Sequence, residues 1–357
     1  MSSLYPFLRR IPCEEPRNKM WDLYLLLESE PQVISFLCQR YTALGEKEAK
    51  KLAYRAAEPL IHYIKQARQT YLACYQADVA VKPLLSYYGM TYLCKAFLLQ
   101  HDPYYPRKAD VLRHGLTTRK RKKRNFRFYE DEVKIQREGL FPLLTQALHA
   151  PSLEAEFIHM RSCYALLPEL QDSYRQVFGE STLAPILELS PSTQVGTGMS
   201  FCVEESILDN LHLTKKAFLQ RLNHHRISND YRFTLDQPAV RGGRLHLLWQ
   251  HNDIPHVNRW AHGFHHPFFR EDTQGGYSLY TGDSRLVHVS EILIHLILLF
   301  ALSMVCRYET PLWGEIIGGS AAEDRIFIHE FLRLTERKFP QLMLHAFFQE
   351  KVLFTTS

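Results

Sequence analysis

Residues 83–100 read PLLSYYGMTYLCKAFLLQ, with apolar or aromatic side chains at most positions. A helix that is apolar all round is typical of a core position, where other helices surround it. Pro83 suits the first turn of such a helix, because that turn leaves its N–H groups unpaired in any case. Gly89 lowers helix propensity by about 1 kcal/mol relative to alanine, which favours a close-packing point over a surface position. The stretch therefore predicts a buried helix inside a helical body.

Helical patterns continue on both sides of this stretch. Apolar residues recur at spacings of three and four through residues 46–76, and Pro59 within that segment predicts a kink. Further helices are expected at 18–43 with a break at Pro31, 140–148, 153–178, 208–222, 292–308 and 323–339. Short strand-like runs separated by glycine turns are expected at Met199–Val203, Tyr231–Leu235, Arg244–Trp249 and Tyr277–Tyr280.

These elements predict a mainly α fold, α+β overall, in which a helical bundle body carries an inserted small β-containing module. We expect an N-terminal helical part at 1–185 and a mixed module with short strands at 186–288. The C-terminal helices at 289–357 are expected to pack on the first part. At 357 residues, with 46% hydrophobic and 23% charged residues, the composition is that of a soluble globular protein.

The cysteines and the N-terminus indicate a cytoplasmic protein without a membrane partner. Seven cysteines occur at wide spacings without a C-x-x-C pair, which is typical of reduced, buried thiols. The first residues, MSSLYPFLRRIP, lack the apolar core of a signal peptide. The most apolar window, Ile292–Val305, is shorter than the roughly 20 residues needed to span a bilayer.

One segment, Arg107–Arg127, carries the positive charge of the chain. It holds ten lysines and arginines against the single acid Asp110, so its net charge is +9, whereas the whole chain carries only +5. Such a segment favours a phosphate-bearing partner such as RNA or a nucleotide. The alternative is a solvated loop that binds nothing. The aromatic residues that follow, Phe126, Phe128 and Tyr129, offer rings on which bases could stack.

Several residues are candidates for ligand binding. Arginines bind phosphate with two hydrogen bonds, and a histidine among cations is a candidate general base near neutral pH. The predicted ligand-binding residues are Lys82, Arg113, His114, Arg119, Arg121, Arg124 and Arg307. His114 has the alternative role of capping a turn at Gly115. For Lys82 the alternative is simple solvent exposure, and for Arg307 it is an ion pair with Glu309 or Glu315.

Cofactor and metal sites are not predicted. The histidine-rich middle of the chain contains His262-x-x-His265, which could offer two imidazoles to a metal, but no carboxylate has a matching spacing. The chain also lacks the glycine-rich nucleotide motifs and the H-E-x-x-H string. These absences argue against NTPases, nucleotide-cofactor oxidoreductases and zinc proteases.

Four blocks of the sequence together resemble the bacterial YaaC-like proteins. They are Lys82-Pro83 with YYGMTYLCKAFLL, the basic loop with His114-Gly115-Leu116, LSMVCRYETPLWGEI at 302–316 and RKFPQL at 337–342. Their order and spacing fit from about residue 20 to 345. This family is poorly characterised, so the resemblance implies no particular activity.

A weaker resemblance links the N-terminal helical part to HEPN-type domains. It rests on Tyr87-Tyr88 with Gly89, the following Lys95 helix, and His114 in the loop. The resemblance implies either an inactive binding module or a metal-independent endoribonuclease, in which His114 would be the base and Arg107 would steady the phosphate. It also implies a homodimer. The Arg107/His114 spacing recurs at five other places, about as often as chance predicts, so by itself it indicates no activity.

Three hypotheses follow for the function. The leading one is a cytoplasmic binding or regulatory protein that recognises RNA, a nucleotide or another phosphate-bearing partner through residues 107–127. The second is a HEPN-like endoribonuclease that uses His114. The third is a protein–protein interaction module whose basic segment contacts an acidic partner.

Overall fold

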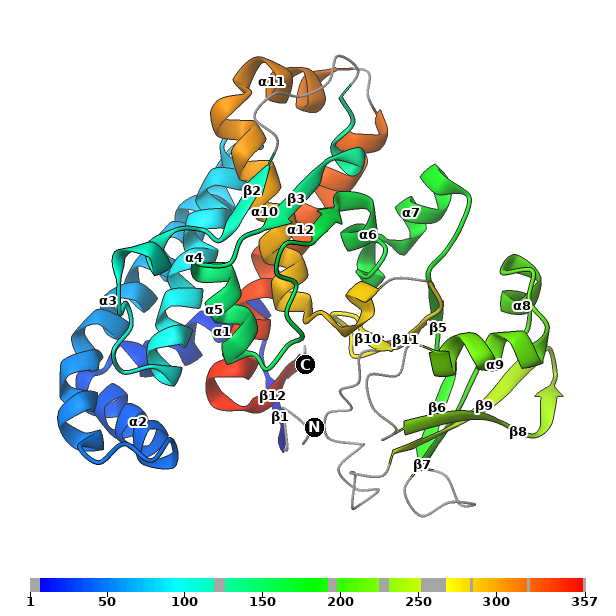
Figure 1. Cartoon of the computed structure of the whole chain (residues 1–357), viewed down its shortest axis with the longest axis horizontal. Coiled ribbons are helices and arrows are strands. Elements are labelled where there is room, and N and C mark those ends of the chain that lie inside the picture. The colour runs from blue at the N-terminus through cyan, green and yellow to red at the C-terminus, as the bar shows by residue number, and fades with distance from the viewer. Residues whose placement is uncertain are drawn as a thin grey trace. The chain divides into compact units, whose positions relative to one another are not determined.

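The chain forms two compact units, seen here in a computed structural model (Figure 1). The structure describes residues 7–118, 126–191, 198–224, 231–251, 268–282, 285–319 and 322–355. The helical unit comprises Arg10–Tyr164, Val289–Phe348 and Phe354–Ser357, and the mixed unit comprises Met1–Arg9, Ala165–His288 and Gln349–Leu353. The predicted fold class, mainly α with a small β-containing module, is confirmed.

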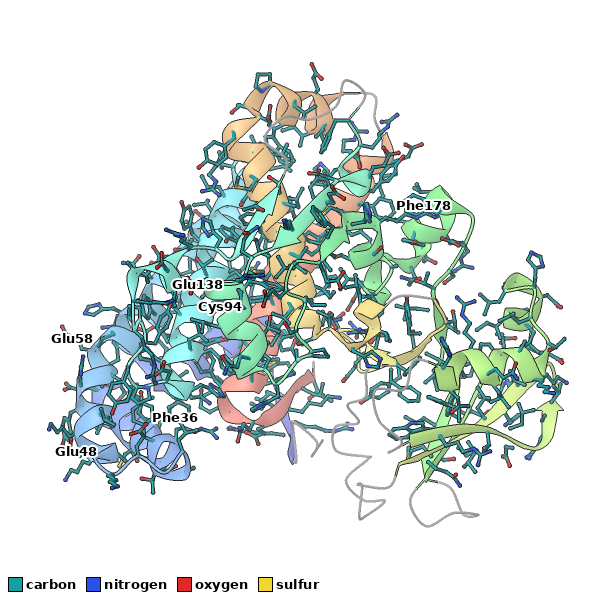
Figure 2. All side chains as sticks on the ribbon, in the orientation of Figure 1. Phe36, Glu48, Glu58, Cys94, Glu138 and Phe178 are labelled. Carbon is teal, nitrogen blue, oxygen red and sulfur yellow. The ribbon has the colours of Figure 1, made fainter. Side chains whose placement is uncertain are left out.

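The helical unit is built around α4 (Lys82–His101), against which α3, α10 and α12 all pack. The helices of this unit are α1 (Pro16–Tyr24), α2 (Glu30–Ala43), α3 (Ala49–Gln76), α4, α5 (Leu140–Ala147), α6 (Met160–Tyr164), α10 (Glu291–Tyr308), α11 (Thr310–Gly318) and α12 (Ala322–Phe348). Pro59 lies within α3, which is a single helix. Cys94, labelled in Figure 2, is one of the α4 side chains without solvent exposure.

Burial covers most of the surface of α4, as its sequence predicts. Gly89 is a point of close packing, because a Cβ atom there would lie 2.9 Å from two ring atoms of Tyr71 on α3. From the middle of the helix onward, Tyr88, Tyr92 and Lys95 retain solvent exposure. Their spacing of four and three residues places them on one face, so a single stripe of α4 reaches the surface.

A small antiparallel sheet in the helical unit was not predicted from the sequence. It pairs β2 (Leu116–Thr118) with β3 (Glu132–Ile135), and β3 with β4 (Phe157–His159). The prediction of one helix over 153–178 is wrong, because β4, α6 and α7 (Gln171–Phe178) occupy that range. Strands of three or four residues are too short to produce a recognisable alternation of apolar and polar side chains.

The mixed unit contains a four-stranded antiparallel sheet in the order β6-β7-β9-β8. Its strands are β6 (Glu188–Pro191), β7 (Gly198–Glu204), β8 (Tyr231–Arg241) and β9 (Arg244–His251). A second sheet has the order β10 (Phe269–Glu271), β11 (Tyr277–Tyr280) and β5 (Leu183–Pro185). All four strands that the sequence predicted are present. A two-stranded sheet pairs β1 (Phe7–Pro12) with β12 (Glu350–Thr355).

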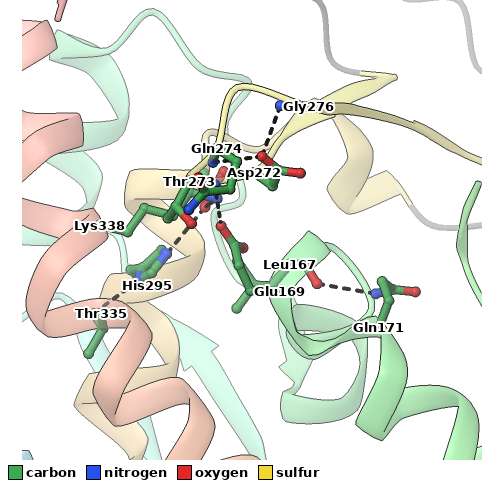
Figure 3. A network of polar contacts seen from close by, with 11 residues as sticks. Leu167, Glu169, Gln171, Asp272, Thr273, Gln274, Gly276, His295, Thr335 and Lys338 are labelled. Carbon is green, nitrogen blue, oxygen red and sulfur yellow. Dashed lines mark hydrogen bonds and ion pairs between the residues drawn. The ribbon is translucent and has the colours of Figure 1, made fainter. Parts of the chain in front are cut away.

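Two local features interrupt the helices and strands of the mixed unit. The single helix expected at 208–222 is two, α8 (Ser206–Asn210) and α9 (Lys215–His224), because the backbone at His212 has a φ of 53°. After β10, the Asp272 carboxylate accepts hydrogen bonds from the N–H groups of Gln274 and Gly276, which closes the turn to β11 (Figure 3).

Helix α10 is apolar enough to resemble a membrane-spanning helix. It is the one described helix with the required length and hydropathy, but 78% of its residues are buried inside the protein. The core helix of a soluble protein has the same properties, so α10 is a weak indication of a membrane span.

A polar network joins α10 to α12 within the helical unit. The Nδ1 atom of His295, a fully buried residue, lies 2.9 Å from the Thr335 hydroxyl (Figure 3). Lys338 forms an ion pair with Glu291 at 2.6 Å. Burial alone would raise the pKa of Glu291, but the charge of Lys338 and the hydrogen bond with His295 outweigh it and lower this pKa to about 2. The Glu291 carboxylate is therefore ionised in the folded protein at neutral pH.

Replacing Gly89 with alanine is expected to destabilise the protein. Overpacking a core costs about 1–3 kcal/mol, which exceeds the gain in helix propensity of about 1 kcal/mol. Gly314→Ala is the matched control, because Gly314 lies in α11 with no atom within 4 Å of its added Cβ. Urea unfolding should separate the two variants by about 2 kcal/mol, and equal stabilities would contradict the close packing of α4 on α3.

Replacing Glu291 with glutamine is expected to lower the free energy of unfolding by about 3–5 kcal/mol, because it breaks the buried ion pair with Lys338. The double variant Glu291→Gln/Lys338→Met should recover most of this stability. Because the pKa of Glu291 is lower in the folded protein, its stabilisation is present above pH 4.5 and disappears as the pH falls towards 2.

Chemical denaturation at several pH values checks both expectations. Glu138→Gln is the control, since it removes an exposed carboxylate that pairs with Lys108 and should change stability little. A Glu291→Gln variant as stable as the unmodified protein would show that the ion pair does not stabilise α10 against α12.

Candidate functional site

His114 is held in place by its backbone. Its carbonyl accepts a hydrogen bond from the N–H of Phe141 at 3.1 Å, and the carbonyl of Arg113 accepts one from Leu140 at 2.7 Å. These bonds satisfy the first N–H groups of α5, which no helical carbonyl can reach. Gly115 has a φ of 76°, and a Cβ there would lie 2.5 Å from Pro142, so glycine is required next to His114. His114 does lie at a turn, but the turn also anchors α5.

The imidazole of His114 contacts Tyr87 of α4. Its Nδ1 atom lies 2.7 Å from the Tyr87 hydroxyl, and the Phe300 ring centroid lies 5.5 Å from that of the imidazole. Tyr87 is buried, and burial raises its pKa, so its hydroxyl keeps its proton. Among the described residues, Nδ1 is the hydroxyl's one hydrogen-bond partner. Because a buried O–H requires an acceptor, Tyr87 donates to Nδ1, and neutral His114 carries its proton on Nε2.

The pKa of His114 is lowered from its ordinary value. Burial is the largest cause, and the positive charges of Arg307 and Lys95 lower the pKa further. The cations beside His114 therefore come from α10 and α4. They are not its neighbours in the sequence.

Arg307, in the last turn of α10, lies beside Tyr88. Its Nε donates to the Ser303 carbonyl at 3.2 Å, and its guanidinium carbon lies 6.0 Å from the Tyr88 ring centroid and 5.2 Å from that of Tyr308. The hydroxyl of Tyr88 is 3.5 Å from the guanidinium group, at the long end of a hydrogen bond. No carboxylate of the described residues pairs with Arg307, so the ion pair expected with Glu309 or Glu315 is absent from this part of the chain.

Lys95 also lacks a carboxylate partner among the described residues. Its ammonium lies 5.8 Å from the ring centroids of both Tyr63 on α3 and Tyr92 on α4. Burial lowers the pKa of Lys95, because removing water from an ammonium group disfavours its charge. We call Lys95, His114 and Arg307 the basic cluster.

Two other partly buried cations of the helical unit have a carboxylate partner. Lys82 lies 2.7 Å from Glu336, and Arg68 lies 2.6 Å from Glu28. Lys82, which was a predicted ligand-binding residue, is thus engaged in an ion pair and does not join the basic cluster. An ammonium or guanidinium group withdrawn from water requires a compensating charge. The basic cluster is therefore suited to an anion from outside the chain.

The described cations of segment 107–127 are largely neutralised. Arg107 pairs with Asp102, Lys108 with Glu138, and Arg113 with Asp110, all close to the surface. The predicted role of Arg113 in phosphate binding would require it to leave Asp110. Arg119, Arg121 and Arg124 lie outside the described residues.

Two further expectations from the sequence concern base stacking and metal binding. Phe128 is fully buried and packs near Tyr164, with ring centroids 6.3 Å apart, so its predicted role in base stacking is wrong. No group of three metal-ligating side chains occurs in the described parts of the chain. The His262 and His265 pair, for which no metal site was predicted, falls outside them.

Sequence reasoning missed the aromatic part of the site. Tyr63, Tyr87, Tyr88 and Tyr92 surround the basic cluster, and none was a candidate. A signal for two of them was present in the sequence. Tyr88, Tyr92 and Lys95 follow a helical spacing within an otherwise apolar stretch, which is typical of a face that is not fully covered.

The surroundings of His114 predict how its titration responds to mutation. Arg307→Gln should raise the pKa of His114, because it removes a positive charge that opposes protonation. Arg137→Gln is the control, since this side chain is 84% exposed and pairs with Glu154. NMR titration of histidine ring carbons measures the effect. An unchanged pKa in Arg307→Gln would show that the guanidinium does not act on His114.

Comparison with known proteins shows the family to which the chain belongs. No curated protein and no solved structure matches the chain. A family model described as YaaC-like Protein matches residues 25–347, a range that contains α4, His114 and Arg307. That range covers most of the chain, which therefore belongs to the YaaC-like family.

Proposed function

We propose that this protein binds a phosphate-bearing ligand, RNA or a nucleotide, at the basic cluster. The observation that carries the proposal is the absence of any carboxylate partner for Lys95 and Arg307 among the described residues, although both are partly buried. A phosphate group would supply the missing negative charge, and a guanidinium group matches its geometry well.

His114 contributes a hydrogen-bond donor to this site. Because Tyr87 occupies Nδ1, and no described residue accepts from Nε2, the proton on Nε2 can be donated to a phosphate oxygen. The His114 side chain belongs to segment 107–127, and the lysines and arginines at 119–124 follow a few residues later. These add positive charge that attracts a polyanion over longer distances.

A non-catalytic role is better supported than the endoribonuclease alternative. A general base needs an unprotonated nitrogen within reach of the 2′-hydroxyl group, whereas the Tyr87 bond favours the tautomer with the proton on Nε2. Arg107, the other residue of the HEPN-like hypothesis, is engaged by Asp102. We propose that binding takes place in the cytoplasm, in line with seven cysteines that form no disulfide.

The proposal is tested by measuring the affinity of a short single-stranded RNA by fluorescence anisotropy in EDTA. Lys95→Gln and Arg307→Gln should each weaken binding about ten- to a hundredfold, the value of one hydrogen bond to a charged group. The slope of log affinity against log salt should decrease in magnitude by about 0.7 for each RNA phosphate that the variant no longer neutralises.

The controls are Lys51→Gln and Arg137→Gln, which remove exposed cations that pair with Glu48 and Glu154. They should leave both affinity and salt slope nearly unchanged. Equal weakening in all four variants would indicate a general charge effect and contradict the basic cluster as the site. RNA cleavage in EDTA that disappears in His114→Ala would favour the endoribonuclease instead. Capture of an acidic protein without RNA binding would favour the interaction module.

A further inference from the structure

The exposed stripe of α4 repeats one arrangement twice, a tyrosine ring with a cation beside it. At one end Tyr88, 40% exposed, lies 6.0 Å from the guanidinium carbon of Arg307. At the other end the ammonium of Lys95 lies 5.8 Å from both the Tyr63 and the Tyr92 ring centroids. A ring with a neighbouring cation is the arrangement with which proteins hold one nucleotide, the base on the ring and the phosphate on the cation.

The two ends are separated along the helix. The rings at the two ends belong to Tyr88 and Tyr92, four positions apart on one face, which corresponds to about 6 Å along the axis. Each ring can stack with a different base, and two bases bring separate phosphates. His114 contacts Tyr87, the residue before Tyr88, through its Nδ1 atom, and the charges of Arg307 and Lys95 both lower its pKa. The site therefore extends over more than one nucleotide.

The rings at the second end form a stacked pair. The Tyr63 and Tyr92 ring centroids are 6.5 Å apart with an angle of 27° between the ring planes, and both side chains are partly exposed. Most large aromatic side chains in the core of the helical unit are fully enclosed, as are Tyr24, Tyr41 and Tyr71. Two nearly parallel tyrosines at the surface, beside an ammonium for which the described residues provide no carboxylate, are therefore a feature that core packing does not require.

We infer that the ligand of the basic cluster is a single-stranded nucleic acid that runs along the exposed stripe of α4. One base stacks on Tyr88 and another on the Tyr63 and Tyr92 pair, while Arg307 and Lys95 hold phosphates. This inference rests on the proposed phosphate-binding function. A duplex is excluded from this mode, because its bases stack on each other and offer no free face to a side chain.

The test compares two RNA strands of equal length, one with bases and one abasic, in fluorescence anisotropy at the same salt concentration. The intact protein should bind the base-bearing strand about a hundredfold more tightly, because each of the two stacked bases contributes about 1–3 kcal/mol. Tyr92→Leu should lower this preference about tenfold, since the base on Tyr88 still stacks, and should leave affinity for the abasic strand unchanged. Tyr92→Phe keeps the ring and should keep the preference.

Tyr54→Leu is the matched control, because Tyr54 is an exposed tyrosine of α3 without a cation partner among the described residues. It should behave like the unmodified protein. Binding of the abasic strand by Tyr92→Leu also shows that this variant is folded.

The inference is overturned if the unmodified protein binds both strands equally, or if Tyr92→Leu weakens both to the same extent. In either case, the phosphate-binding function is still supported if Arg307→Gln weakens binding of the abasic strand. If Arg307→Gln leaves binding of the abasic strand unchanged, the phosphate-binding function is contradicted as well. If neither strand binds, both proposals fail.

Discussion

The enclosure of α4 by α3, α10 and α12 is the constraint on which the rest of the helical unit depends. This enclosure requires a nearly continuous apolar sequence and a glycine where the Tyr71 ring lies against the backbone. It also requires a hydrogen-bond partner for the hydroxyl group of the buried Tyr87. His114 is that partner, so the burial of one helix also fixes the position of the histidine. The single stripe of α4 that stays uncovered is where side chains are available for binding.

Charge compensation distinguishes the candidate site from the rest of this unit. Lys82 and Lys338 each have a carboxylate within 3 Å, as the cost of burying an unpaired charge demands. Lys95 and Arg307 face tyrosine rings, which attract cations much more weakly than a carboxylate does. The protein thus tolerates two cations that an external anion would stabilise. Such a preformed site is a common way to gain affinity without ordering a loop.

Several predictions from the sequence were accurate for clear physical reasons. The buried helix at 83–100 was recognisable from its long apolar run, and the four strands of the mixed unit from strand-forming residues between turn signals. The sheet of β2, β3 and β4 was missed, since its strands of three or four residues follow or lie within a strongly charged stretch. Phe128 was taken for a binding residue because exposure cannot be read from a ring's neighbours in the sequence. The HEPN-like resemblance and the homodimer stay predictions.

The sequence by itself determined the fold class, the central helix, the family and the excess of positive charge around His114. Only the tertiary structure decided which cations are available to a ligand. Arg107 and Arg113 are neutralised by nearby acids, whereas Lys95 and Arg307 come from two distant helices and remain uncompensated among the described residues. The physical reason is that charge compensation depends on distance in space, and a chain's local charge count contains no information about the partners that folding brings together.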